Sequence, residues 1–254
     1  MKNNFKRMLR EQKPGIVGWL AIPSGFSAEI MAQCGWDAIT VDLQHGVQDY
    51  QSMVCCFQAM QTHPVTPLVR VPVNEPGIIG KVLDAGAHGV ICPMVNTRTE
   101  AEAMVSACLY PPKGKRSNGP IRAGLYGVST DYQKVANEEV MVIPMIETIE
   151  AVNNLESILD VPGIDCVYIG PSDLGISMGK PPVLDREDPE MMKIYTHVIA
   201  ECRKRNILTG IHSNSAAYSV KMIETGFNWV AIANDSSLMA MASKDVVGKF
   251  RQGL

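Results

Sequence analysis

The chain has 254 residues, of which 46% are hydrophobic, and its formal net charge at pH 7 is −3. This length allows one large hydrophobic core, and a single α/β barrel takes about 250 residues. The nearly balanced charge, without a basic run, argues against nucleic acids and anionic membranes as partners. The seven cysteines form no Cys-x-x-Cys pair. With no apolar stretch of roughly 18 residues and no signal-peptide pattern, the sequence predicts a cytoplasmic protein with reduced thiols.

Short runs of Val, Ile and Leu alternate along the chain with longer amphipathic segments. The apolar runs predict strands at Ile16–Ala21, Ala38–Asp42, Pro67–Val71, Gly89–Cys92, Val140–Ile146, Cys166–Ile169, Leu208–Ile211 and Trp229–Ala233. Helices are expected near 27–33, 50–61, 76–85, 98–108, 150–159, 188–205, 215–225 and 236–250. This order favours one α/β domain over residues 1–254, a TIM (β/α)8 barrel. An open doubly wound sheet is the alternative, but no Gly-x-Gly-x-x-Gly follows the first strand.

Residues 110–137 interrupt this alternation. The segment is rich in Pro, Gly, Lys and Arg, and it exceeds the usual αβ connection of about 2–6 residues. We expect a long insertion that forms an active-site lid, a subunit contact or both. A plain surface insertion is the alternative.

Two carboxylates follow neighbouring apolar runs. Glu147 closes the run 141–146, and Asp173 follows the run 165–172. An acid at the mouth of a buried strand is costly unless something binds it. On adjacent parallel strands, about 4.8 Å apart, two such acids can reach one divalent cation. The alternative is that they cap the following helices, which fits Asp173 better because Thr148 is itself a good cap.

The residue types near these acids favour a particular class of metal. No cluster of Cys or His accompanies them. An oxygen-rich site completed by water suits Mg²⁺ or Mn²⁺ rather than structural zinc.

Further polar residues end other strands, where a βα barrel places its catalytic groups. Arg70 ends the apolar run 66–69 and must find an anion, either a substrate carboxylate or Asp42, and both are compatible. His45 suits proton transfer near neutral pH, and Asp42, three residues earlier, could orient its ring. His212 also lies at a strand end, but only its position supports a role.

The turn from Gly170 to Asp173 leads from a strand into a helix-like segment. Amide groups at a helix N-terminus attract anions, so the N–H groups of Ser172 and Asp173 could bind a carboxylate. No lysine ends an expected strand. This argues against an aldolase that works through a Schiff base.

Together these residues resemble the HpcH/HpaI aldolases, the group of 4-hydroxy-2-oxoheptanedioate and 2-keto-3-deoxy sugar acid aldolases. More distantly, the chain is similar to the citrate lyase β-subunit superfamily. The resemblance spans nearly the whole chain. It rests on the motifs VDLQHG at 41–46, VRVP at 69–72, LDAGA at 83–87, PMV at 93–95, YPPKGKR at 110–116, IET at 146–148 and IGPSDL at 169–174.

The resemblance implies a barrel of the phosphoenolpyruvate/pyruvate type and a class II aldolase. Such an enzyme cleaves a 4-hydroxy-2-oxo acid reversibly into pyruvate and an aldehyde. It implies that Glu147 and Asp173 bind Mg²⁺, Mn²⁺ or Co²⁺, which pyruvate chelates. Arg70 would then contact the keto oxygen, and the turn of Gly170, Ser172 and Asp173 would hold the carboxylate.

The resemblance also implies an acid–base pair and an assembly. His45 with Asp42 matches the family's acid–base dyad, and Asp84 matches a residue contributed across a subunit interface. A homotrimer or hexamer with a C-terminal helix swapped between subunits is expected.

The chain departs from the well-known members at Gln44, where Glu precedes the histidine, and at Met145, where the heptanedioate aldolases carry Gln. These positions bear on the aldehyde, which the sequence does not identify. Two other functions remain open: an acyl-CoA lyase of the citrate lyase β type, and a non-catalytic barrel that binds an oxo acid.

Overall fold

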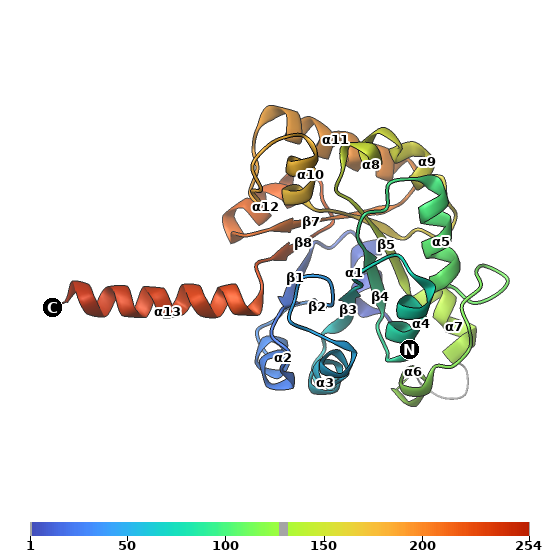
Figure 1. Ribbon diagram of the computed structural model, residues 1–254, viewed down its shortest axis with the longest axis horizontal. Coiled ribbons are helices and arrows are strands. Elements are labelled where there is room, and N and C mark those ends of the chain that lie inside the picture. The colour runs from blue at the N-terminus through green and yellow to red at the C-terminus, as the bar shows by residue number, and fades with distance from the viewer. Residues whose placement is uncertain (1, 127–131, 254) are drawn as a thin grey trace.

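Eight parallel strands form a closed barrel, each hydrogen-bonded to its neighbours in chain order (Figure 1). The computed structural model describes residues 2–126 and 132–253. The strands are β1 (Gly15–Leu20), β2 (Ala38–Asp42), β3 (Thr66–Arg70), β4 (Gly89–Cys92), β5 (Met141–Ile146), β6 (Cys166–Ile169), β7 (Leu208–Ser213) and β8 (Trp229–Ile232). The predicted TIM (β/α)8 barrel is confirmed, and each strand ends within two residues of its predicted bounds.

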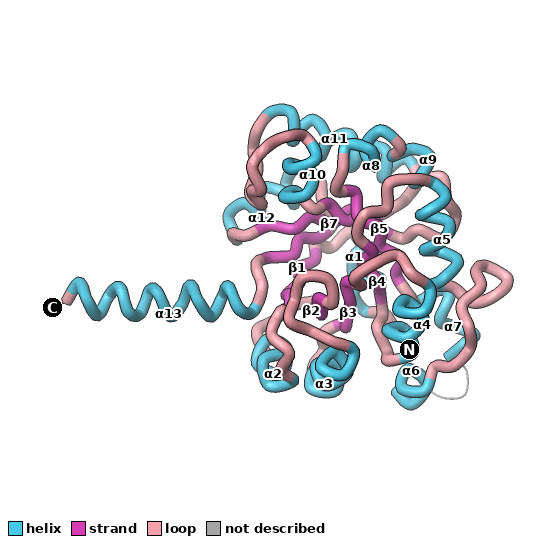
Figure 2. The backbone as a smooth tube through the Cα atoms, viewed as in Figure 1, coloured by secondary structure: helices cyan, strands magenta, loops and turns pink. Residues whose placement is uncertain are grey.

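Helices surround the strands (Figure 2). The expected helix at 150–159 is divided in two at Asn154, because that residue leaves helical geometry with a ψ of 7°. The helices are α1 (Asn4–Arg10), α2 (Gly25–Ala32), α3 (Tyr50–Met60), α4 (Pro76–Asp84), α5 (Arg98–Cys108), α6 (Ile121–Tyr126), α7 (Tyr132–Glu139), α8 (Ile149–Asn153), α9 (Leu155–Leu159), α10 (Pro171–Ser177), α11 (Pro189–Lys204), α12 (Ala216–Thr225) and α13 (Asp235–Gln252).

Helix α1 closes the amino-terminal end of the barrel and was not expected from the sequence. Asn3 caps the helix through its side chain, which accepts a hydrogen bond from the Lys6 amide. Phe5 and Leu9 lie four residues apart on one helix face, and both are buried among the side chains inside the barrel. A Cβ at Gly15 would lie 2.5 Å from the Phe5 ring, so only glycine lets β1 pass this close to α1.

Aromatic rings fill the barrel from α1 toward the other end. The Phe5 ring meets Trp229 edge-on at 5.8 Å, and Trp229 stacks on Tyr168 at 4.7 Å. Tyr168 in turn stacks on Trp19, with ring centroids 5.8 Å apart. We call these four rings the aromatic column. Gly210 makes room for it, because a Cβ there would lie 2.1 Å from the Trp229 ring.

The expected insertion contains α6 and α7, between α5 and β5. The Arg116 guanidinium lies 4.5 Å from the Tyr110 ring centroid and 5.7 Å from that of Tyr132. It also forms an ion pair of 2.7 Å with Asp84 at the end of α4. Cation–π contacts and a partly buried ion pair therefore fasten the insertion to α4. Residues 127–131 of the insertion lie outside the described residues.

Helix α13 extends away from the barrel (Figure 1). Its first residue, Asp235, is buried and accepts hydrogen bonds from the Ala21 amide at 2.8 Å and the Ser27 hydroxyl at 2.7 Å. Beyond this anchor the helix exposes the apolar side chains Met239, Met241, Val246, Val247 and Phe250. Of the helices in the described part of the chain, none combines the length and the apolar character needed to cross a membrane.

Candidate active site

The polar strand-end residues continue the inward-facing rows of the strands. Side chains two positions apart in a strand point to the same face. Leu68 and Met145 lie inside the barrel, so Arg70 and Glu147, two residues further along, point toward the barrel axis as well. The same alternation places His212 inside, two residues after Gly210. These side chains therefore meet above the aromatic column, at the carboxyl ends of the strands.

Arg70 and Asp42 form an ion pair with two hydrogen bonds. Arg70 Nε donates to Asp42 Oδ1 at 2.9 Å and Nη2 donates to Oδ2 at 2.6 Å. Trp19 Nε1 donates to the same Oδ2 at 3.1 Å. Burial alone would raise the pKa of Asp42, but the hydrogen bonds and charge of Arg70 lower it overall. The internal salt bridge therefore exists, and Arg70 Nη1, which donates to no described residue, is left for a ligand.

His45 lies in the exposed loop after β2. Asp42 Oδ1 accepts hydrogen bonds from the backbone amides of Gln44 at 3.1 Å and His45 at 3.3 Å. No described residue hydrogen-bonds the His45 ring. The oxygens of Asp42 accept hydrogen bonds from Arg70, Trp19 and the loop amides, and Asp42 thereby fixes the backbone of the loop that carries His45. That Asp42 and His45 act as an acid–base pair stays a prediction.

Glu147 is buried, with 2% of its surface exposed. Its Oε1 accepts a hydrogen bond of 2.8 Å from the amide of Met94, a residue with an uncommon φ of 55°. Burial raises the pKa of Glu147 to about 7, and the nearby charge of Asp173 acts in the same direction. Gly170 leaves space for the carboxylate, because a Cβ there would lie 2.7 Å from Oε2. A cation bound at Oε2 would stabilise the ionised form of this carboxylate.

Asp173 is exposed in the first turn of α10. Helix α10 starts from Gly170 without any side-chain cap, so Asp173 does not take the capping role that was its alternative. Thr148 does cap α8, as expected, by accepting a hydrogen bond of 3.0 Å from the Ala151 amide. The Asp173 carboxylate, and the amides of Ser172 and Asp173, have no hydrogen-bond partner among the described residues.

Glu147 and Asp173 together supply oxygen donors only. Within residues 2–126 and 132–253, no three His, Cys, Asp or Glu side chains converge as a complete metal site. Two carboxylates would leave the other positions of a hard cation to water or substrate oxygens, which is the usual arrangement for Mg²⁺. The donor set therefore fits a divalent metal of this class.

The family assignment rests on a match over most of the chain. Residues 16–242 match the HpcH/HpaI aldolase/citrate lyase family. The chain belongs to this family. The resemblance stated from the motifs is thus confirmed, and the protein is a carbon–carbon lyase. Aldolases of the HpcH/HpaI family generally depend on a divalent metal ion.

Named relatives cover nearly the full chain. A protein of Rhizorhabdus wittichii, named hydroxypyruvate/pyruvate aldolase, is 38% identical over 98% of this chain and 99% of its own length. A 4-hydroxy-2-oxo-heptane-1,7-dioate aldolase of Salmonella paratyphi A is 36% identical over 98% of this chain and 95% of its own. A solved HpcH/HpaI family structure from Burkholderia cenocepacia has a TM-score of 0.92 at 29% identity, covering 98% of this chain and all of its own.

In this member of the HpcH/HpaI family, Asp84 lies away from the other predicted site residues of the same chain. It ends α4, which runs back from β3 toward the amino-terminal end of the barrel. Its Oδ1 accepts a hydrogen bond of 2.7 Å from Arg116. A role for Asp84 at the active site therefore requires a second subunit.

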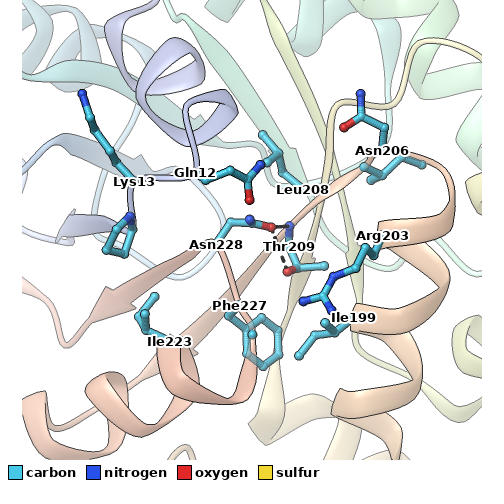
Figure 3. A pocket seen from close by; sticks show the side chains of 13 residues that line it. Gln12, Lys13, Ile199, Arg203, Asn206, Leu208, Thr209, Ile223, Phe227 and Asn228 are labelled. Carbon is cyan, nitrogen blue, oxygen red and sulfur yellow. Dashed lines mark hydrogen bonds between the residues drawn. The ribbon is translucent and has the colours of Figure 1, made fainter.

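This HpcH/HpaI family member also has a crevice at the amino-terminal ends of β7 and β8 (Figure 3). It measures about 290 Å³, and residues of α11, α12 and the loop before β1 line it. There Asn228 Oδ1 accepts hydrogen bonds from the Thr209 amide at 2.8 Å and the Thr209 hydroxyl at 3.2 Å. No predicted site residue lines this crevice, so it is separate from the candidate active site.

Proposed function

We propose that the protein is a class II pyruvate aldolase, which cleaves a 4-hydroxy-2-oxo acid reversibly into pyruvate and an aldehyde. The names of the full-length relatives support this reaction. The observation that carries the proposal is the pair of carboxylates at adjacent strand ends. Glu147 is buried with one oxygen unoccupied, and Asp173, one strand on, has no hydrogen-bond partner in the described chain.

Glu147 and Asp173 would hold a divalent ion, Mg²⁺, Mn²⁺ or Co²⁺. When bound, the ion supplies a Lewis acid that polarises the keto group of the substrate. The substrate carboxylate would be held by the amides of Ser172 and Asp173 at the start of α10, where the helix end also favours an anion. Gly170, which begins this turn, also contributes to the metal site, because its missing side chain leaves room for the Glu147 carboxylate.

Arg70 stabilises the negative charge that develops during cleavage. Its Nε and Nη2 are fixed by Asp42, which leaves Nη1 to donate to the keto oxygen. A donor that is already oriented costs no rearrangement in the transition state. Removal of the proton from the 4-hydroxyl group, which we assign to His45, then releases the aldehyde as the C3–C4 bond breaks. The bonding electrons remain on pyruvate as its enolate, which takes up a proton at C3.

The test is the exchange of pyruvate methyl protons for deuterium, followed by NMR. The Mg²⁺-loaded protein should exchange them, and excess EDTA should abolish the exchange. Full exchange in EDTA would overturn the proposal. Cleavage of a panel of 4-hydroxy-2-oxo acids would then identify the aldehyde.

The assembly belongs to the same proposal. We infer a homotrimer or hexamer in which α13 packs on a neighbouring subunit, because its apolar side chains are exposed on one chain. In such an assembly Asp84 would reach the active site of a neighbour. Light scattering coupled to gel filtration should give three or six subunits, and a monomer at micromolar concentration would contradict this assignment.

A further inference from the structure

One polar side chain of the site has no part in the proposed chemistry. His212 lies at the carboxyl end of β7, inside the barrel. Its ring meets the Trp19 ring at 4.9 Å with an interplanar angle of 85°. Trp19 also hydrogen-bonds Asp42 and lies 5.1 Å below the Arg70 guanidinium. Through Trp19, His212 therefore borders the Asp42–Arg70 pair.

The contact with Tyr168 fixes the protonation of the ring. Tyr168 Oη lies 2.7 Å from His212 Nδ1. No other described group accepts a hydrogen bond from this buried phenol, and burial raises its pKa well above the ordinary value. Burial and the charge of Arg70 also lower the pKa of His212 to about 4. The ring is therefore neutral, with Nδ1 accepting from the phenol and the proton on Nε2.

Nε2 is open toward the solvent side of the site. His212 is partly exposed, and no described residue accepts a hydrogen bond from Nε2. Nε2 is not sealed inside the barrel, so water or a ligand can reach it. An oriented N–H donor without a protein partner will favour an oxygen over a methyl group at that point.

Resting on the proposed function, we propose that His212 Nε2 binds a hydroxyl group of the substrate close to the bond that forms or breaks. The carboxylate and keto groups of pyruvate are already served by Arg70, the carboxylate pair and the amides of α10. The remaining oxygen is either a hydroxyl on C3 of the oxo acid or a hydroxyl beside the aldehyde carbon. The enzyme is therefore selective for hydroxylated substrates of these two kinds.

Four reactions separate the two sources of the hydroxyl. Pyruvate or hydroxypyruvate is combined with acetaldehyde or glycolaldehyde in the presence of Mg²⁺, and kcat/KM is measured for wild type and His212→Phe. The phenylalanine keeps an aromatic ring against Trp19 but removes the donor. We expect kcat/KM to fall about tenfold for the partner whose hydroxyl is bound. The reaction of pyruvate with acetaldehyde should change by less than about twofold.

Controls keep the result interpretable. His197→Phe makes the same substitution at an exposed histidine of α11 and should retain the wild-type selectivity. If His212→Phe folds poorly because Tyr168 loses its acceptor, the double variant with Tyr168→Phe removes both partners. An equal loss in all four reactions, or no loss in any, would overturn the assignment.

Failure of the proposed function is recognised separately. It would leave wild type without methyl exchange in pyruvate. The ratio of Kd values for hydroxypyruvate and pyruvate, measured by tryptophan fluorescence, then still tests His212. The ratio should change about tenfold in His212→Phe if the C3 hydroxyl is bound, and the ratio of Kd values for glycolaldehyde and acetaldehyde should change by that factor if the hydroxyl beside the aldehyde carbon is bound. If neither ratio changes, the assignment of Nε2 is overturned.

Discussion

Replacing Asp42 by Asn tests how the site holds Arg70. The change keeps the shape of the side chain but removes its charge. Arg70 would then keep its guanidinium in a place where only 11% of the side chain is exposed, without its partner at 2.6 Å. Breaking a buried ion pair from one side costs about 3–5 kcal/mol. We expect the free energy of unfolding to fall by that amount, and kcat/KM to fall because Arg70 Nη1 loses its fixed direction.

A double-mutant cycle separates the pair from its surroundings. Asp42→Asn, Arg70→Gln and the double variant are unfolded in urea, and the coupling energy is taken from the four free energies. We expect a coupling of about 2 kcal/mol or more. The control is the exposed pair Arg98–Glu102 of α5, whose distance of 2.7 Å is nearly the same, and its coupling should not exceed about 0.5 kcal/mol. Equal coupling for both pairs would refute the argument from burial.

Three further predictions concern the carboxylates and His212. Gly170→Ala should lower kcat about tenfold or more, because a Cβ would lie 2.7 Å from Glu147 Oε2; a wild-type kcat would contradict this crowding. Mg²⁺ should raise the Tm of EDTA-treated wild type but not of Glu147→Gln. Glu150→Gln, an exposed control, should respond like wild type. If Mg²⁺ still raises the Tm of Glu147→Gln, Glu147 is not a ligand. The neutral His212 ring, with its pKa lowered from 6.5 to about 4, contributes stability above pH 6.5 that is lost as pH falls through about 4. In urea titrations His212→Phe should therefore remove about 3 kcal/mol of this pH dependence, and identical profiles for both proteins would refute it.

The barrel could be predicted because its strands are short, apolar runs that differ sharply from the segments between them. Helix α1 escaped prediction for the opposite reason. It has only seven residues, and its apolar pair, Phe5 and Leu9, becomes meaningful only when the open end of the barrel is known. Asn3, which caps α1 through its side chain, was the one local signal that could have found it.

The site was predictable where one strand decides the position of a residue. Arg70 and Glu147 follow from the alternation of side chains in β3 and β5. Side-chain contacts between neighbouring strands were not predictable, because they depend on the register between the strands. Trp19 comes from β1, and the hydrogen bond from its indole to Asp42 in β2 was not expected from the sequence. Likewise no partner for His212 could be read from the sequence, because Tyr168 is 44 positions away and meets it only through the pairing of β6 with β7.

The aromatic column and α1 leave the barrel with one opening. Phe5, Trp229, Tyr168 and Trp19 fill the interior from the closed end up to the ion pair of Asp42 and Arg70. Both cleavage products must therefore leave through the same opening, and the product that is bound deeper cannot leave before the other. In the proposed arrangement pyruvate binds nearest the floor, between Arg70 and the two carboxylates, so the aldehyde should leave first and the kinetics of cleavage should show an ordered release.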